Sequence, residues 1–110
     1  MKMILYHNKN CSKSRECLSI LIKKKIDFEV RDYIKENLTL NEIEHLINNL
    51  KSELEEIIRD KKLFNKGKII NKVELSNHLF QNPKNIQRPI FFNGTNYYIC
   101  RPPELVKELI

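Results

Sequence analysis

The chain opens with a short apolar run, a polar turn and a helical pattern. Residues 3–6 read Met-Ile-Leu-Tyr and predict a buried strand, and the polar residues 7–10 predict a turn. Residues 11–25 predict a helix, because apolar residues recur at helical spacing and lysines close the run, as suits a helix C-terminus. The apolar positions of this helix are Leu18, Leu21 and Ile22.

A second strand is predicted over residues 28–33, where the pattern alternates. Its apolar positions are Phe28, Val30 and Tyr33. Because a helix separates the two strands, we expect them to be parallel and joined by a right-handed crossover.

Three cap patterns predict that the middle of the chain is helical. In each, a Ser, Thr or Asn precedes an acidic residue by three positions, as at a helix N-terminus. The pairs are Thr39 with Glu42, Ser52 with Glu55, and Asn71 with Glu74. The apolar stripes that follow them are Ile43, Leu46, Ile47 and Leu50, then Leu54, Ile57 and Ile58, then Val73 and Leu79. Residues 61–70 carry no comparable pattern.

Two further apolar runs predict a hairpin near the C-terminus. Residues 89–92 (Pro-Ile-Phe-Phe) and 97–100 (Tyr-Tyr-Ile-Cys) flank a loop that starts with Asn93-Gly94 and is lengthened by residues 95 and 96. A final helix should follow, because two prolines suit its first turn. They are Pro102 and Pro103, and the packing positions after them are Leu105, Val106 and Leu109.

The order of these elements indicates the fold class. Strand, helix, strand, helical block, hairpin and final helix is the order of an α/β, thioredoxin-like fold. We therefore expect a mixed four-stranded sheet flanked by helices. A helical insertion separates the N-terminal strand-helix-strand unit from the C-terminal hairpin and helix. Thioredoxin-like domains serve many chemistries, so the function has to be argued from the site.

Length and composition indicate one globular domain that spans residues 1–110. Apolar residues make up 41% and charged residues 31%, a balance typical of a soluble protein. We see no targeting segment and no stretch long enough to cross a membrane. The three cysteines lack the paired spacing of a secreted disulfide framework. We therefore expect a cytoplasmic protein.

The formal net charge of +6 does not indicate a nucleic-acid partner. Most positive residues are lysines scattered along the chain, with neither a basic stripe nor interleaved aromatic residues. The five arginines are Arg15, Arg31, Arg59, Arg88 and Arg101. Because the chain uses lysine so freely, these arginines are candidates for positions that need a planar, bidentate cation.

Cys11 is the candidate nucleophile. It stands where the first strand gives way to the first helix, so the helix dipole and free backbone N–H groups favour its thiolate. Lys13, Arg15 and His7 are placed to add positive potential. A thiolate at this position is both a nucleophile and the anchor of an anion pocket. The alternative is a buried, inert cysteine, which fits a polar turn less well.

The other two cysteines are expected to pack in the core. Cys17 lies within the predicted helix, beside Leu18. Cys100 ends a strand of the hairpin, where a resolving thiol stays an open alternative. His7 and Cys11 are four residues apart, but two residues without further ligands do not indicate a metal site.

Two arginines and a proline are expected at the same end of the sheet as Cys11. Pro89 stands where thioredoxin-like proteins carry a cis proline, at the start of the third strand and beside the reactive cysteine. Arg88 precedes it, and Arg101 lies where the fourth strand passes into the final helix. The alternative is that both arginines are ordinary surface residues.

Three motifs together resemble the glutaredoxin-linked arsenate reductases, which are related to the Spx regulators. The motifs are His-Asn-x-x-Cys-x-x-Ser-Arg at 7–15, Arg-Pro-Ile at 88–90 and Cys-Arg-Pro at 100–102. The resemblance implies that Cys11 is the catalytic cysteine and that three arginines bind the oxyanion, namely Arg59, Arg88 and Arg101. It also implies that His7 and Ser14 help to stabilise the thiolate. We add Arg15 to these supporting residues.

The resemblance implies reduction of arsenate. The Cys11 thiolate attacks arsenic, water leaves, and a thioarsenate adduct forms. Glutathione attacks the adduct, glutaredoxin resolves the mixed disulfide, and arsenite departs. The implied partners are arsenate, glutathione as co-substrate and glutaredoxin, with no metal and no bound cofactor. We expect a monomer.

Two other functions stay open. Spx regulators share the fold and bind RNA polymerase, but they usually carry Cys-x-x-Cys, whereas Ser14 holds the second position here. A glutathione-linked thiol oxidoreductase of the same fold would not use arsenate, but such a site does not by itself require three arginines. Residues 63–85 are rich in Lys and Asn and depart from the family pattern, which bears on any lid over the anion pocket.

Overall fold

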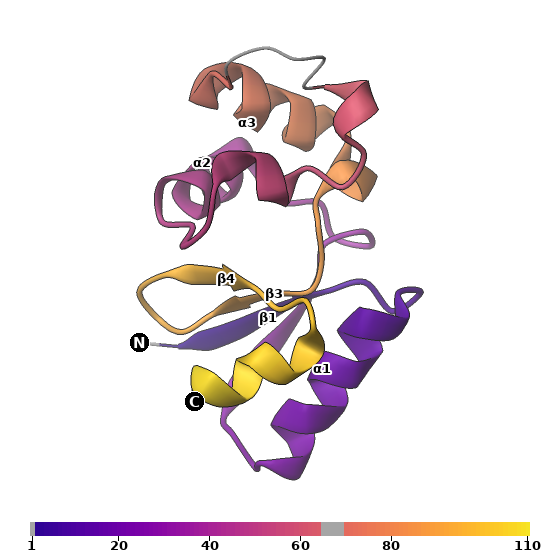
Figure 1. Ribbon diagram of the computed structural model, residues 1–110, viewed down its shortest axis with the longest axis vertical. Helices are drawn as coiled ribbons and strands as arrows, with labels where there is room; N and C mark the ends of the chain where they lie inside the picture. The colour runs from indigo at the N-terminus through magenta and orange to yellow at the C-terminus, as the bar shows by residue number, and fades with distance from the viewer. Residues whose placement is uncertain (1, 65–69) are drawn as a thin grey trace.

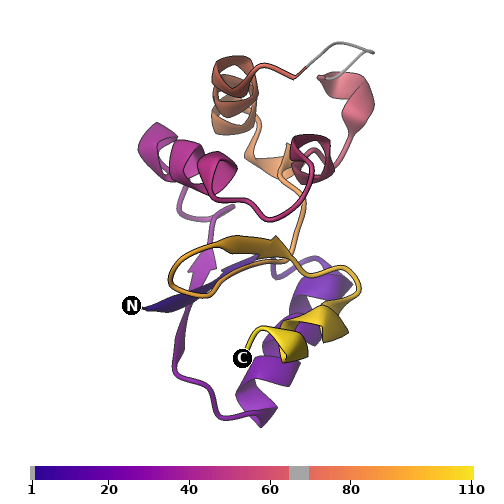
Figure 2. The ribbon, with the colours of Figure 1, turned by 60° about the vertical axis from the view of Figure 1, so that its left-hand side comes forward.

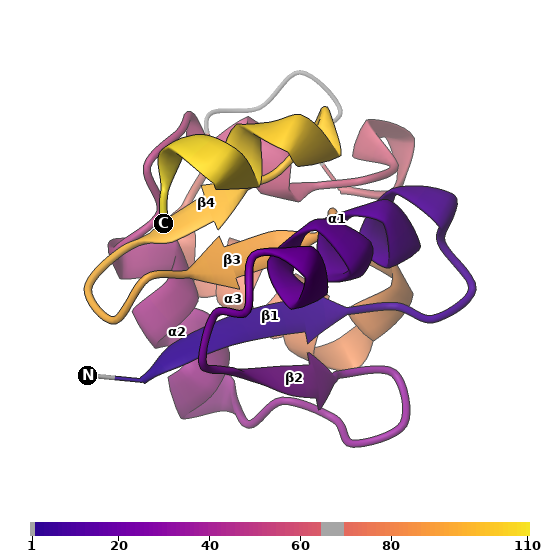
Figure 3. The same cartoon turned by 90° about the horizontal axis from the view of Figure 1, so that it is seen from below.

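The apolar runs at the two ends of the chain pair into one sheet. The computed structural model describes residues 2–64 and 70–110. The strands are β1 (Met3–His7), β2 (Phe28–Asp32), β3 (Ile90–Phe92) and β4 (Tyr97–Ile99). β1 is parallel to β2 and antiparallel to β3, and β4 pairs antiparallel with β3. The order is β2-β1-β3-β4 (Figure 3), so the predicted mixed four-stranded sheet is confirmed.

Helices cover both faces of this sheet (Figures 1 and 2). α1 (Ser12–Lys23) and the 3-10 helix η4 (Pro103–Glu108) lie on one face, and the helical insertion lies on the other. The central strand β1 is buried on both sides, because Leu5 packs on the α1 side and Tyr6 beneath the insertion. This explains its continuous apolar run. No helix in the described part of the chain is long and apolar enough to span a membrane.

The segment between β2 and β3 forms the predicted helical insertion. Its elements are α2 (Leu40–Asn48), η1 (Leu54–Ile57), η2 (Lys61–Leu63), α3 (Lys72–Gln81) and η3 (Pro83–Asn85). Thr39 forms a full capping box with Glu42 at the start of α2, and Asn71 accepts from two backbone N–H groups of α3. Both predicted caps are confirmed. Within the segment that departs from the family pattern, residues 65–69 lie outside the described residues.

The helix predicted after Ser52 is wrong. Ser52 Oγ donates to a neighbouring carbonyl oxygen 3.4 Å away, and only the short 3-10 helix η1 forms. After η1 the backbone pairs with the segment that leads to β3: Arg59 N donates to the Asn85 oxygen at 2.9 Å, and Gln87 N donates to the Ile57 oxygen at 2.7 Å. Because of this long-range pairing, the helix does not continue beyond η1, and Arg59 lies beside the segment that leads into β3.

Three apolar positions of the predicted helices face solvent. They are Ile22 (60% exposed), Val73 (68%) and Leu105 (38%). In α1 the buried stripe runs through Cys17 and Leu21, and Ile22 lies about 100° around the helix from Leu21. Val73 lies in the first turn of α3, before its buried residues begin. In η4 the three-residue repeat of a 3-10 helix buries Pro103 and Val106 instead of Leu105.

The hairpin forms with the lengthened loop that was predicted. Asn93 N donates to the Asn96 oxygen at 3.1 Å across the loop, and Gly94 has a φ of 103°, which glycine adopts without a steric penalty. The strand register places the open end of the hairpin beside the C-terminal end of β1. Arg88 and Arg101 therefore lie at the same end of the sheet as Cys11, as expected.

Candidate functional site

The loop after β1 holds Cys11 at the N-terminus of α1. Cys11 N donates to the Asn8 carbonyl oxygen at 3.0 Å, and Arg15 N donates to the Cys11 oxygen at 3.1 Å, so the loop turns directly into the helix. The buried Asn8 N–H donates to the Ser14 hydroxyl oxygen at 3.4 Å. Cys11 is the N-cap residue, with extended backbone angles of −104° and 122°. Its sulfur lies near the free N–H groups of the first helical turn.

The surroundings of Cys11 favour its thiolate. Burial raises the pKa of the thiol, but hydrogen-bond donors around the sulfur outweigh this effect and lower the pKa from 9.0 to about 7. The donors are the backbone N–H groups of Ser14 and Lys13, the Ser14 hydroxyl and the Arg88 guanidinium. Because they stabilise the charged form, about half of Cys11 is ionised at neutral pH.

Arg88 is anchored beside this sulfur by backbone carbonyl groups. The Arg88–Pro89 peptide bond is cis, as the position of Pro89 predicted. Arg88 Nη1 donates to the oxygen of Lys84 at 2.8 Å and to that of Ile86 at 3.2 Å. Its Nε is buried and has no hydrogen-bond partner among the described residues. The guanidinium also lowers the pKa of Cys11 as a hydrogen-bond donor, so it is directed to the sulfur and to an anion bound there.

Arg59 and Arg101 flank Arg88 from two different elements. Arg59 Nη1 donates to Gln87 Oε1 at 3.2 Å, and Arg101 Nη1 donates to the Arg88 carbonyl oxygen at 2.8 Å. Both side chains are largely exposed. The three arginines predicted to bind an oxyanion are thus brought together, with Arg88 at the thiolate and the other two beside it.

Of the residues predicted to support the thiolate, only Ser14 lies at the sulfur. His7 is buried at the end of β1, and burial lowers its pKa. This lowered pKa disfavours the positive charge that was expected from His7. Arg15 is exposed, and its Nη1 donates to the Lys9 carbonyl oxygen at 2.8 Å. Arg15 thus stabilises the loop before Cys11.

Cys17 and Cys100 pack in the core between the sheet and α1, as predicted. Both are fully buried, in a cluster with Leu5, Leu21 and Phe91. A hydrogen bond to Cys17 and burial both raise the pKa of the Cys100 thiol. Because neither sulfur is exposed to solvent, neither thiol is accessible for reaction. Within the described residues, no three His, Cys, Asp or Glu side chains gather as a metal site would require.

Tyr33 is a site residue that the sequence pattern did not reveal. It follows β2 and is fully buried. Its hydroxyl donates to the Ile86 carbonyl oxygen at 3.3 Å, the oxygen that also accepts from Arg88. The alternating pattern indicated that the ring is buried, but nothing in it indicated a hydroxyl partner on a segment 53 residues away.

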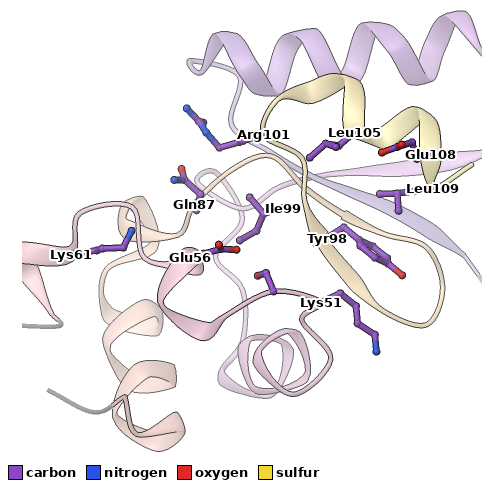
Figure 4. A pocket seen from close by; sticks show the side chains of 11 residues that line it. Lys51, Glu56, Lys61, Gln87, Tyr98, Ile99, Arg101, Leu105, Glu108 and Leu109 are labelled. Carbon is purple, nitrogen blue, oxygen red and sulfur yellow. The ribbon is translucent and has the colours of Figure 1, made fainter. Parts of the chain in front are cut away.

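A groove leads away from the site along β4 (Figure 4). It has a volume of about 550 Å³ and lies between η1 and η4. Arg101 and Gln87 line one end, and Lys51 and Tyr98 line the other. Of the three arginines, Arg101 lines the groove, so the groove opens beside the arginine cluster.

The sheet, the cis proline and the thiolate at a helix N-terminus together define a thioredoxin-like protein. The model of the ArsC family matches residues 6–109. The chain is 34% identical to the arsenate reductase of Haemophilus influenzae, over 100% of both proteins. It is 31% identical to the uncharacterised protein YfgD of Escherichia coli, over 96% of this chain and 94% of that one.

The solved structure of the arsenate reductase from Vibrio cholerae is similar throughout. The TM-score is 0.87 at 32% sequence identity, with 100% of this chain and 98% of that chain covered. The chain therefore belongs to the ArsC family.

Proposed function

We propose that this protein reduces arsenate to arsenite through a covalent thioarsenate adduct on Cys11, with glutathione and glutaredoxin as the thiol donors. The observation that carries the proposal is the pairing of Cys11, whose pKa is lowered to about 7, with the Arg88 guanidinium. A nucleophile and a fixed cation at one point suit the attack of a thiolate on a tetrahedral oxyanion.

In the first step the Cys11 thiolate forms a bond to arsenic, and one arsenate oxygen leaves as water after protonation. The adduct keeps arsenic in the As(V) state. A glutathione thiolate then attacks the Cys11 sulfur, and the electron pair of the sulfur–arsenic bond passes to arsenic, which leaves as arsenite. Cys11 and glutathione are left as a mixed disulfide, which the glutaredoxin thiol reduces.

The arginines supply the charge that this chemistry needs. Arg88 directs its guanidinium to Cys11 while Nη1 is anchored to the backbone. Arg59 and Arg101 are exposed beside it and complete the cluster from the segments that follow η1 and β4. Cations fixed where negative charge collects stabilise the transition state without reorganising. Arginine suits the task because its planar fork binds two oxygens at once.

The groove along β4 supports an approach for the thiol donor. It ends at Gln87 and Arg101, next to the segment that carries Arg88. Its charged lining residues are Lys51, Lys61 and Arg101 together with Glu56 and Glu108, so a donor that carries both an ammonium group and carboxylates, as glutathione does, finds partners for each.

The test is arsenate-dependent oxidation of NADPH in the presence of glutathione, glutaredoxin and glutathione reductase. We expect turnover by the wild type, none by Cys11→Ser, and a fall of about 100-fold or more for Arg88→Ala, as for loss of one transition-state donor. Arg31→Ala is the matched control, because Arg31 pairs with Glu42 at 3.2 Å, outside the arginine cluster. Absence of turnover in a folded wild type would refute the proposal and direct the search to RNA polymerase binding or another thiol substrate.

A further inference from the structure

The hydroxyl of Tyr33 shares its acceptor with Arg88. Tyr33 is 0% exposed, and its ring packs in the core beneath the helical insertion. The Tyr33 hydroxyl donates to the Ile86 carbonyl oxygen at 3.3 Å, and Arg88 Nη1 donates to the same oxygen at 3.2 Å. Two donors on one oxygen lie close together, so the phenol lies beside the guanidinium.

Charges of the site act directly on this phenol. Burial raises the pKa of Tyr33 to about 12, while Arg88 and Arg59 act to lower it and Cys11 acts to raise it. The phenol is therefore close to the thiolate and to two of the arginines. Because its pKa is so high, it stays protonated at neutral pH and contributes hydrogen bonds rather than acid or base chemistry.

We propose that Tyr33 is a positioning residue that holds the Arg88 guanidinium at the Cys11 sulfur. The inference rests on the proposed roles of Cys11 and Arg88. An arginine side chain is long and flexible, and among the described residues this one is anchored to the backbone only through Nη1, at Lys84 and Ile86. The phenol is held by a rigid, buried ring, and Arg88 acts on its pKa both by charge and by hydrogen bonding. The contact limits the orientations of the guanidinium, so that its remaining donors stay directed to the anion.

Packing of the core needs the ring of Tyr33 but not its hydroxyl. The Ile86 carbonyl oxygen keeps Arg88 as a donor when the hydroxyl is removed. Tyr33→Phe therefore tests the hydroxyl with little change in packing. Tyr97→Phe is the matched control, because Tyr97 lies in the same core cluster and its hydroxyl meets His45 Nδ1 at 2.7 Å instead.

The first readout is the pH dependence of the reaction of Cys11 with a small disulfide probe, and the second is kcat and KM for arsenate. For Tyr33→Phe we expect the midpoint of the pH profile to move upward and kcat/KM to fall about 2- to 10-fold, the usual effect of one hydrogen bond. Tyr97→Phe should leave both unchanged. A wild-type pH profile and wild-type kinetics in folded Tyr33→Phe would overturn the proposal.

A double-mutant cycle with Arg88→Ala separates a positioning role from an independent one. If Tyr33 acts through Arg88, Tyr33→Phe changes neither readout once Arg88 is alanine. An equal loss in both backgrounds would mean that Tyr33 acts on Cys11 or on substrate without Arg88, and would refute the inference. The probe reaction contains no arsenate, so this result stands even if the chain does not reduce arsenate.

A measurement on the wild type covers the case in which Tyr33→Phe fails to fold. In solution NMR, we expect one guanidinium N–H signal, assigned to Arg88 by its loss in Arg88→Ala, to exchange slowly and to show contacts with the Tyr33 ring. A rapidly exchanging signal without those contacts would contradict the proposal.

Discussion

The reactivity of Cys11 as a function of pH is the most direct test of the site. The pKa of Cys11 is lowered from 9.0 to about 7. At neutral pH about half of such a thiol is ionised, against about 1% of an ordinary one, an advantage of roughly 50-fold in thiolate concentration. A thiolate of lower pKa is also a weaker nucleophile, and over two pKa units this costs about 6- to 10-fold. The net expectation is a reaction roughly 5- to 8-fold faster than that of an ordinary thiol.

The assay follows the reaction of the reduced protein with a disulfide probe by absorbance. The rate should rise with pH and level off above about pH 8, whereas an ordinary thiol keeps gaining rate to about pH 10. One equivalent should react, because Cys17 and Cys100 are fully buried, and Cys11→Ser should show no fast phase. Ser14→Ala should move the midpoint upward, toward the ordinary value of 9.0, because the Ser14 hydroxyl is one of the donors at the sulfur. A rate that climbs without a plateau through about pH 9 would refute this account of the site.

Three further predictions concern stability. The folded pKa of Cys11 is depressed, so the thiolate's contribution to stability is complete above pH 9.0 and is lost as pH falls through about 7. In thermal melts with reductant, the Tm of the wild type should therefore rise relative to that of Cys11→Ser between pH 7 and 9. A constant difference in Tm across this range would contradict the pKa shift. Thr39→Ala should cost about 0.5–2 kcal/mol in urea unfolding through loss of the α2 capping box, whereas Ser52→Ala, at a predicted cap that does not form, should cost almost nothing. Leu21→Ala should lower the free energy of unfolding by about 2–5 kcal/mol because Leu21 is fully buried. Ile22→Ala should change it by no more than about 0.5 kcal/mol because Ile22 is 60% exposed. Similar losses at the two positions would mean that the buried face of α1 is assigned wrongly.

Local sequence patterns correctly predicted the elements that are stabilised by residues close to them in the sequence. The cap at Thr39 is made by Glu42, three residues on, so the sequence contains the whole interaction. The cap predicted at Ser52 failed because the backbone that follows pairs with the segment around Asn85 and Gln87. A local pattern does not include partners so far along the chain. Leu105 was assigned to a packing position because an α-helix was assumed, whereas the 3-10 repeat of η4 buries Val106.

The residues of the candidate site also differ in whether the sequence alone reveals their role. Cys11 was predicted from its place between a strand and a helix, and the arginines from motifs that resemble a family. The lowered pKa of His7 is caused by burial, which a polar turn did not indicate. Tyr33 was missed as a site residue because its hydroxyl donates a hydrogen bond to the carbonyl oxygen of Ile86, which follows the helical insertion in the sequence.

The antiparallel pairing of β1 with β3 brings together Cys11 and Arg88, which are far apart in the sequence. Cys11 follows directly on β1, whereas Arg88 immediately precedes β3, and these strands meet only when both ends of the molecule are in place. A chain that ends before Arg88 therefore lacks one of the donors that lower the pKa of Cys11. The part of the thiol reactivity that depends on the guanidinium therefore arises only once β3 has paired with β1.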